Sequence, residues 1–98
     1  MKLHGKRKKL DDEKVRYQFK GDINIYTVAR LKNILLNELI KFHSLEFDLS
    51  GIENFDTSGF QLFLFLKREA KEKERRMQIL SKSNEVIRIF DFYKTSFE

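Results

Sequence analysis

The chain has 98 residues, and its charge is unevenly distributed along it. Twenty Lys and Arg stand against fifteen Asp and Glu, which gives a formal net charge of +5. Five cations precede the first acid, Asp11, and they are Lys2, Lys6, Arg7, Lys8 and Lys9. The remaining chain carries fifteen charges of each sign. Proteins that bind nucleic acid directly spread their cations over the folded body, so we expect no direct DNA binding by this small single domain.

Several other classes of protein are disfavoured by composition. The chain has no Cys, which excludes disulfides and thiolate chemistry. No apolar run approaches the roughly 20 residues of a membrane span, and no apolar stretch follows the basic start as in a secretory signal. The two histidines, His4 and His43, are far apart, and the four glycines form no phosphate-binding loop. We therefore expect a cytoplasmic protein that is not an enzyme and holds no cofactor or metal.

Hydrophobic periodicity predicts the first elements of the fold. Residues 1–14 are charged and nearly devoid of apolar side chains, which predicts a basic, disordered arm ahead of a domain at 15–98. Val15, Tyr17 and Phe19 alternate with polar residues, as in a half-buried strand. Gly21-Asp22 is typical of a turn, so a short strand around Ile23 to Ile25 would complete a hairpin.

The rest of the chain alternates between helical and strand patterns. An amphipathic helix is predicted over Thr27 to Phe42, with the Thr27 hydroxyl as its N-cap. A strand at Leu45 to Leu49 is expected to end at Ser50-Gly51 and to leave Ile52 and Phe55 in a loop. Three further elements are a helix from Ser58 with a charged second half at Lys67 to Arg75, a strand at Met77 to Ile79, and a helix capped by Ser83. The order β-β-α-β-α-β-α predicts an α/β fold, with a mixed central sheet and helices packed on it.

A hydroxyl pair at the start of the second helix is the most informative local feature. Asp56 precedes Thr57 and Ser58, where an acid or a hydroxyl can cap free backbone N–H groups. Capping alone does not require two adjacent hydroxyls. A phosphate on one of them would add a charge of about −1.5 to −2 to a surface that was neutral. Such a change can repel a partner that desolvates this surface, so the segment has the physics of a switch.

At this point the sequence resembles a known family. Asp48-Leu49-Ser50-Gly51-Ile52 followed by Asp56-Thr57-Ser58-Gly59-Phe60 is similar to the central motif of STAS domains, the anti-sigma factor antagonist family. Gly21-Asp22-Ile23-Asn24-Ile25 resembles the family's segment before its first helix, and Ser83-Asn84-Glu85-Val86 resembles the stretch after its fourth strand. The resemblance covers roughly residues 15–97.

The resemblance implies a bacterial binding protein that acts in transcription regulation by partner switching. It implies phosphorylation at Ser58, with Thr57 as a secondary acceptor, by a serine kinase that is also the anti-sigma factor. A phosphatase would reset the switch. The partner-binding residues that it implies are Asn24, Asp56, Thr57, Ser58, Gly59 and Phe60.

Three alternatives to this function stay open. The motif is also similar to that of cytoplasmic STAS subunits of lipid-transport ABC systems, whose partner is the transporter ATPase and whose critical hydroxyl would be Thr57. A small enzyme that uses Asp56 and Ser58 lacks a positioned base. A third alternative is that the basic arm tethers the protein to nucleic acid or to an anionic membrane, with strong salt dependence.

The sequence also departs from the family pattern. Asn24 stands where the family usually has Asp, and Phe60 replaces the commoner Leu as a bulkier apolar group at the expected interface. The chain is short at its C-terminal end, where the family usually continues into a last strand and helix. A sheet edge left exposed there could favour a homodimer. Phe90, Phe92 and Phe97 are either core cover or an exposed patch that would mark a partner surface.

Overall fold

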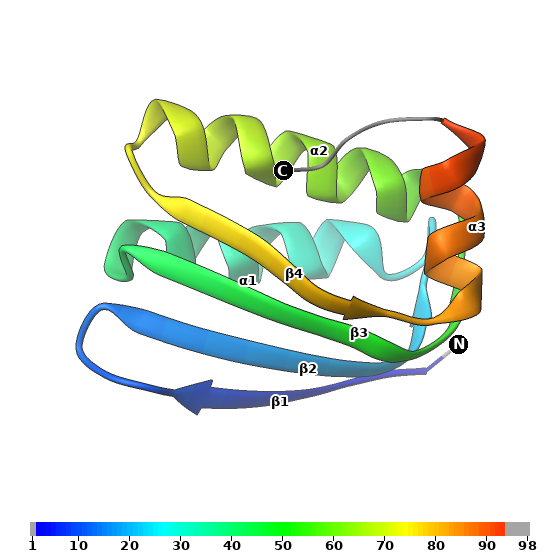
Figure 1. The fold of residues 1–98 in the computed structure, drawn as a ribbon, viewed down its shortest axis with the longest axis horizontal. Coiled ribbons are helices and arrows are strands. Elements are labelled where there is room, and N and C mark those ends of the chain that lie inside the picture. Colours follow the sequence, from blue (N-terminus) through cyan, green and yellow to red (C-terminus); the bar gives the residue numbers. More distant parts are fainter. Residues whose placement is uncertain (1, 94–98) are drawn as a thin grey trace.

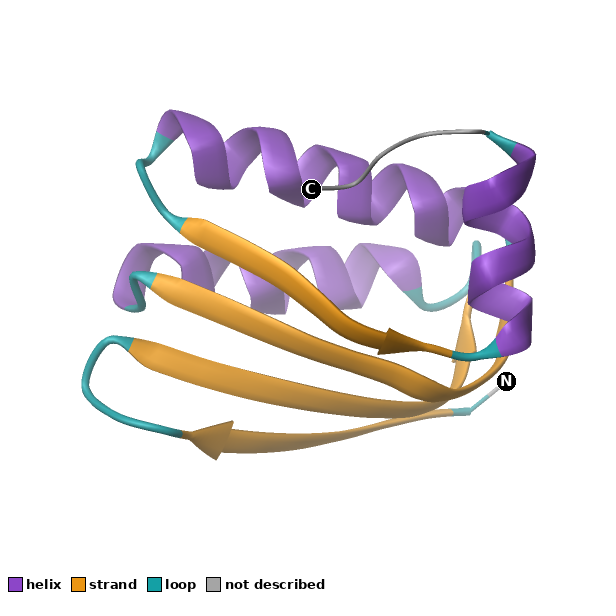
Figure 2. Ribbon diagram, in the orientation of Figure 1, coloured by secondary structure: helices purple, strands orange, loops and turns teal. Residues whose placement is uncertain are grey.

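The computed structural model describes residues 2–93, which form seven elements in the order β-β-α-β-α-β-α (Figures 1 and 2). The predicted α/β class and element order are confirmed. The elements are β1 (Leu3–Lys9), β2 (Lys14–Ile23), α1 (Val28–Lys41), β3 (Ser44–Phe55), α2 (Thr57–Glu72), β4 (Arg76–Lys82) and α3 (Asn84–Phe92).

The four strands form one mixed sheet in the order β1-β2-β3-β4. β1 runs antiparallel to β2, whereas β2, β3 and β4 are parallel to one another. Figure 1 shows α1 and α2 on the same face of the sheet, with α3 at the end where β4 finishes. The β2–α1 loop, the start of α2 and α3 therefore meet at the carboxyl ends of the parallel strands, where α/β folds usually place their binding sites.

The basic N-terminal segment is an edge strand, so the prediction of a disordered arm is wrong for Leu3–Lys9. This strand pairs with β2 from Leu3↔Gly21 to Lys9↔Val15. An edge strand takes its stability from backbone pairing and tolerates lysines, which protect edges against unwanted association. One side chain adds a long-range contact, because the Arg7 guanidinium donates to the buried Glu38 carboxylate of α1 at 2.9 Å.

Gly21 lies within β2, and the predicted turn at Gly21-Asp22 with a second strand beyond it is wrong. The hairpin turn lies earlier, between Lys9 and Lys14, where an Asp11 carboxylate oxygen accepts from the Glu13 N–H at 2.8 Å. Gly21 has a positive φ of 103°, and a Cβ there would overlap the Lys2 carbonyl oxygen. The register against β3 shifts between Gly21 and Asp22. Gly21 therefore permits a bulge in a continuous strand.

β3 continues to Phe55, six residues beyond the predicted end. Ser50 and Gly51 do not end the strand, because Gly51 pairs with Lys20 of β2. Ile52 and Phe55, predicted to lie in a loop, are buried on this strand. The extended β3 delivers the chain directly to the start of α2.

The helices follow their predicted patterns closely. α1 buries Leu31, Leu35 and Leu39 at spacings of four. Ser83 caps α3 by accepting from the Val86 N–H at 3.3 Å, as predicted. The charged end of α2 is exposed at Lys71 and Glu72.

A chain of aromatic contacts links the middle of the core to the end of the molecule where α2 and α3 meet. Phe47 of β3 makes an edge contact with Phe63 of α2 at 5.3 Å between ring centroids. Phe63 contacts Phe55 at 6.4 Å, and Phe55 contacts Phe90 of α3 at 6.0 Å. All four rings are buried. Because close-packed rings transmit displacements, the position of α3 depends on these contacts.

Tyr17 gives the fold a measurable pH dependence. Burial raises the pKa of its hydroxyl to about 12, and the nearby Glu38 carboxylate adds to the effect. The unfolded chain, with a pKa of 10.0, releases this proton first, so the stabilisation is complete below pH 10 and is lost as the pH rises towards 12. Urea unfolding followed by circular dichroism should show this loss in the wild type. Tyr17→Phe should show a smaller decrease in the free energy of unfolding over the same interval, and parallel curves would contradict the assignment.

Candidate partner-binding site

The Asp56 carboxylate joins two segments at the carboxyl end of the sheet. Asp56 has an extended backbone and stands immediately before α2. Its Oδ1 accepts from the Gly59 N–H at 3.3 Å, so Asp56 is the N-cap of α2, where the sequence leaves Asp56 and Thr57 both possible. Its Oδ2 accepts from the Ile25 N–H of the β2–α1 loop at 3.2 Å. One side chain therefore fixes the start of α2 against a loop 31 residues away in sequence.

Asn24 organises the β2–α1 loop from a buried position. Its side-chain oxygen accepts from the Tyr26 N–H at 3.0 Å, and its carbonyl accepts from the N–H groups of Thr27 and Val28. The amide thus supplies the acceptor needed for this turn without the carboxylate usual in the family. Asn24 is only 7% exposed, which leaves little of its side chain for a partner to touch.

The Thr27 hydroxyl faces back into the same loop and does not cap α1 as predicted. It accepts from the Asn24 N–H at 3.0 Å and donates to the Asp22 carbonyl at 3.1 Å. No side-chain cap bond joins Thr27 to the first turn of α1. The Thr27 hydroxyl forms its hydrogen bonds with the chain before the helix and not with the first turn of α1. The local sequence does not distinguish these two arrangements, because both use the same hydroxyl.

The two hydroxyls of the motif differ in their surroundings. Thr57 is exposed, and its Oγ1 lies 3.0 Å from the hydroxyl of Tyr93. Ser58 is half-buried, and the structure records no hydrogen bond of its hydroxyl within residues 2–93. Ser58 stands in the first turn of α2, where backbone N–H groups favour negative charge.

Gly59 and Phe60 are buried, which corrects the expected surface position of Phe60. A Cβ on Gly59 would lie 2.6 Å from Cε1 of Phe55, so the glycine lets α2 approach β3 closely. Phe60 is 5% exposed and stacks on Tyr93 at 4.6 Å between centroids. It also makes an edge contact with Phe90 at 5.2 Å. Phe60 therefore supports the site from beneath, because α3 covers the side of α2 that the sequence left open.

Exposed apolar side chains flank the motif, and sequence reasoning missed most of them. Ile25 is 63% exposed and Tyr26 is 77% exposed, in the loop that Asp56 holds. On the other side, Phe92 is 74% exposed and packs edge-on against Tyr93. For the three phenylalanines that the sequence leaves open between core cover and an exposed patch, Phe92 is exposed, Phe90 is buried, and Phe97 lies outside the described residues. Ile25 and Tyr26 are consecutive apolar residues after Asn24 and were the available signal, but the alternation of Ile23 and Ile25 favours a strand at this place.

Asp48, in the first half of the family-like motif, has a separate structural role. Its Oδ1 accepts from the Ser50 hydroxyl and from the Ser81 hydroxyl of β4, each at 2.7 Å. These hydrogen bonds, that of Ser50 above all, lower the pKa of Asp48. The residue ties β3 to β4 where their register shifts, so it stabilises the sheet and takes no part in the arrangement around Ser58.

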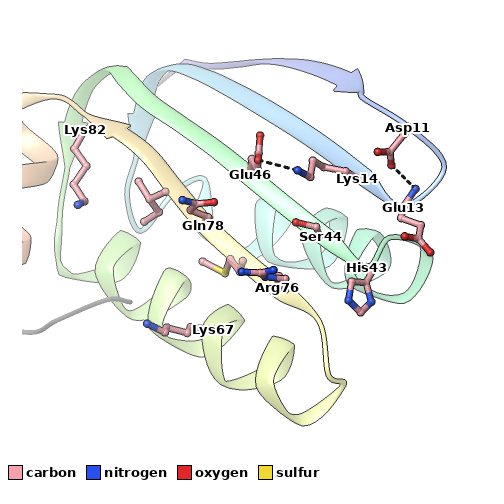
Figure 3. Close-up of a pocket in the computed structure, with 12 residues that line it drawn as sticks. Asp11, Glu13, Lys14, His43, Ser44, Glu46, Lys67, Arg76, Gln78 and Lys82 are labelled. Carbon is pink, nitrogen blue, oxygen red and sulfur yellow. Dashed lines mark hydrogen bonds and ion pairs between the residues drawn. The ribbon is translucent and has the colours of Figure 1, made fainter.

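The cavity drawn in Figure 3 is separate from the motif, because neither Thr57 nor Ser58 is among the residues that line it. It has a volume of about 510 Å³ and is lined by side chains of both signs. Lys14 and Glu46, on neighbouring strands, are ion-paired at 3.6 Å. His43, which lines the cavity, stands immediately before β3, whereas Ser58 follows the end of that strand. Within residues 2–93 no group of three or more His, Cys, Asp or Glu could hold a metal. None of the helices in this part of the chain is long and apolar enough to cross a membrane.

Comparisons with known proteins agree with the fold. The family model described as "Mlab, STAS domain" matches residues 7–95, so the chain belongs to the STAS family. No curated protein sequence matches the chain.

Solved structures share the fold at low sequence identity. The anti-sigma factor antagonist SpoIIAA in its unphosphorylated form has a TM-score of 0.80 and 18% identity, over 92% of this chain and 80% of that one. The phosphorylated form of Bacillus SpoIIAA has a TM-score of 0.76 and 17% identity, over 93% and 84%. An anti-sigma factor antagonist from Mycobacterium paratuberculosis has a TM-score of 0.76 and 16% identity, over 94% and 78%.

Asp56→Ala tests the bridge between α2 and the β2–α1 loop. The variant should lose about 1–2 kcal/mol of stability in urea unfolding, because the helix loses its cap. Hydrogen exchange of the Ile25 amide should also become faster, since its acceptor is gone. Asp12→Ala, at a fully exposed residue of the β1–β2 turn, is the matched control and should change stability by less than about 0.5 kcal/mol. Equal effects of the two substitutions would refute the bridge.

Proposed function

We propose that this STAS domain is a non-enzymatic regulatory binding protein, similar to an anti-sigma factor antagonist, whose partner binding is switched by phosphorylation at Ser58. The observation that carries the proposal is the contrast between the two motif hydroxyls. Thr57 is engaged with Tyr93, whereas the hydroxyl of half-buried Ser58 has no hydrogen bond within residues 2–93. Modification of Ser58 would therefore break none of the recorded hydrogen bonds of the folded domain.

The physical effect of the phosphate would be concentrated at the apolar surface around the motif. Ile25 and Tyr26 are exposed on one side of the motif, and Phe92 is exposed on the other. A partner that covers these side chains must also remove water from the start of α2. A phosphate of about −1.5 to −2 charge would raise the cost of that desolvation steeply, while the helix N-terminus would stabilise it in the free protein.

The proposed partners follow from this mechanism. A serine kinase that also acts as the anti-sigma factor would bind the unphosphorylated domain and modify Ser58, and a phosphatase would reverse the modification. Relatives in the fold comparison support this assignment, because SpoIIAA is described in both unphosphorylated and phosphorylated forms. Asp56, Thr57 and Ser58 would belong to the contact surface, whereas Asn24, Gly59 and Phe60 would shape it from below.

A second candidate function is that of a cytoplasmic STAS subunit of a lipid-transport ABC system, which would bind the transporter ATPase. The greater exposure of Thr57 favours it, since Thr57 would be the key hydroxyl in that role. The two functions differ in which hydroxyl matters and in whether a phosphate is needed. Substitution of each hydroxyl in turn therefore distinguishes them.

Phosphate mapping tests the proposed switch. The protein is incubated with ATP and a serine kinase of the anti-sigma type from the same organism, and mass spectrometry locates the modification. We expect phosphate at Ser58, none in Ser58→Ala, and continued modification of Thr57→Ala. Phosphate confined to Thr57, or its absence from both residues, would contradict the proposal.

Binding to the same kinase provides the second measurement. Calorimetry should give similar affinities for the wild type and Ser58→Ala, whereas Ser58→Asp should bind at least about tenfold more weakly because a charge must be desolvated. Glu53→Gln, at an exposed position of β3, is the control for a change of one charge. Undiminished binding by Ser58→Asp, combined with loss of binding in Thr57→Ala, would favour the transporter-subunit function instead.

A further inference from the structure

The outer edge of β1 is open, and its backbone can accept another strand. β1 is one of the two terminal strands of the sheet, and Figure 1 shows no described element beyond it. The Asp22 N–H donates to the Lys2 carbonyl, and the Leu10 N–H donates to the Lys14 carbonyl. Even-numbered residues therefore direct their backbone groups towards β2, and alternation directs those of the odd-numbered residues Leu3, Gly5, Arg7 and Lys9 towards the open edge.

The positive charge of β1 disfavours pairing of this edge with β1 of a second copy of the chain. β1 carries four consecutive cations at residues 6–9 and no acid. Within residues 2–93, Lys6 and Lys8 form no ion pair, and both are exposed. Arg7 contacts Glu38 of α1, so alternation along β1 places Lys6 and Lys8 on the opposite face of the sheet. Pairing of β1 with another β1 would set these charges side by side, which is unfavourable. An acidic strand would be attracted to the same edge.

An apolar cavity opens beside β1 on its other face. It has a volume of about 200 Å³ and lies between the β1–β2 hairpin and α1. The residues that line it are Leu3, Gly5, Tyr17, Phe19, Arg30, Leu31 and Ile34. Gly5 contributes no side chain to it, and Ile34 is 44% exposed. A strand added along β1 would direct alternate side chains towards this cavity and towards Lys6 and Lys8.

We propose that the β1 edge is a second interaction surface, which binds an extended protein segment whose acidic and apolar residues alternate. The segment pairs with the backbone at Leu3, Gly5 and Arg7. Its apolar side chain opposite Gly5 enters the cavity beside Leu31 and Ile34, and the acidic residues on either side face His4 and Lys6. Main-chain hydrogen bonds supply affinity, and the alternating side chains supply specificity.

The test uses a blocked synthetic peptide, Glu-Val-Glu-Val-Glu-Val-Glu, added to the full chain at low salt and followed by amide NMR. We expect saturable shifts on β1 and slower hydrogen exchange of the Gly5 and Arg7 amides, which gain acceptors. A peptide with Thr in place of Val should bind at least about tenfold more weakly, because it cannot fill the apolar cavity. An N-methylated peptide that lacks the strand-pairing N–H groups should not slow exchange.

Protein variants separate charge from the cavity. Lys6→Glu with Lys8→Glu should weaken binding at least about tenfold, whereas Lys41→Glu with Lys71→Glu, an equal charge change elsewhere, should weaken it less than about twofold. Ile34→Ser should reduce affinity more than Ile40→Ser, because Ile40 is also exposed on α1 but does not line the cavity.

Three results would overturn the proposal. These are equal binding of the Val and Thr peptides, shifts centred on the start of α2 with unchanged exchange at Gly5, and no binding at millimolar peptide. All of these readouts are independent of phosphorylation, so failure here leaves the proposed switch at Ser58 unaffected.

Discussion

The arrangement at the carboxyl end of the sheet depends on the two hydrogen bonds accepted by Asp56. One caps α2 and the other holds the backbone of Ile25, so a single carboxylate sets the distance between the helix start and the β2–α1 loop. Because the Asp56 carboxylate already caps α2 through the Gly59 N–H, the hydroxyl of Ser58 is not needed as a cap. The helix start is therefore stable without the Ser58 hydroxyl, which leaves this half-buried group available for modification.

The core supports this end of the molecule through its aromatic side chains. Phe63 contacts Phe55, and Phe55 contacts Phe90 of α3. Phe90 also contacts Phe60, which stacks on Tyr93. Tyr93 in turn reaches the hydroxyl of Thr57. The end of α3, the first turn of α2 and the exposed Phe92 are consequently parts of one packed assembly. A partner that covers this surface would meet a largely preformed site, which lowers the entropic cost of binding.

Local signals predicted the parts of the fold that depend on neighbouring residues. The cap at Ser83 and the apolar stripe of α1 can be recognised from sequence because each acts within a few residues. For α2 the local sequence indicates a cap but does not decide between Asp56, which the structure shows, and Thr57. The β1 strand was missed because its stability comes from pairing with β2 and from Arg7–Glu38, which are 31 residues apart. Gly21 was assigned to a turn because the carbonyl of Lys2 that packs against it is distant in sequence. The burial of Phe60 likewise depends on where α3 lies, which periodicity within α2 does not encode.

Amide NMR spectra of the protein with serine and with phosphoserine at position 58 show directly whether the phosphate changes local charge while the fold is retained. If the phosphate acts on the surface, shifts should be confined to the β2–α1 loop, the first turn of α2 and the end of α3, and the amides of β1 and the middle of β3 should be unchanged. Widespread shifts through the sheet, or an unchanged loop at Ile25 and Tyr26, would contradict a switch that changes local charge while the fold is retained.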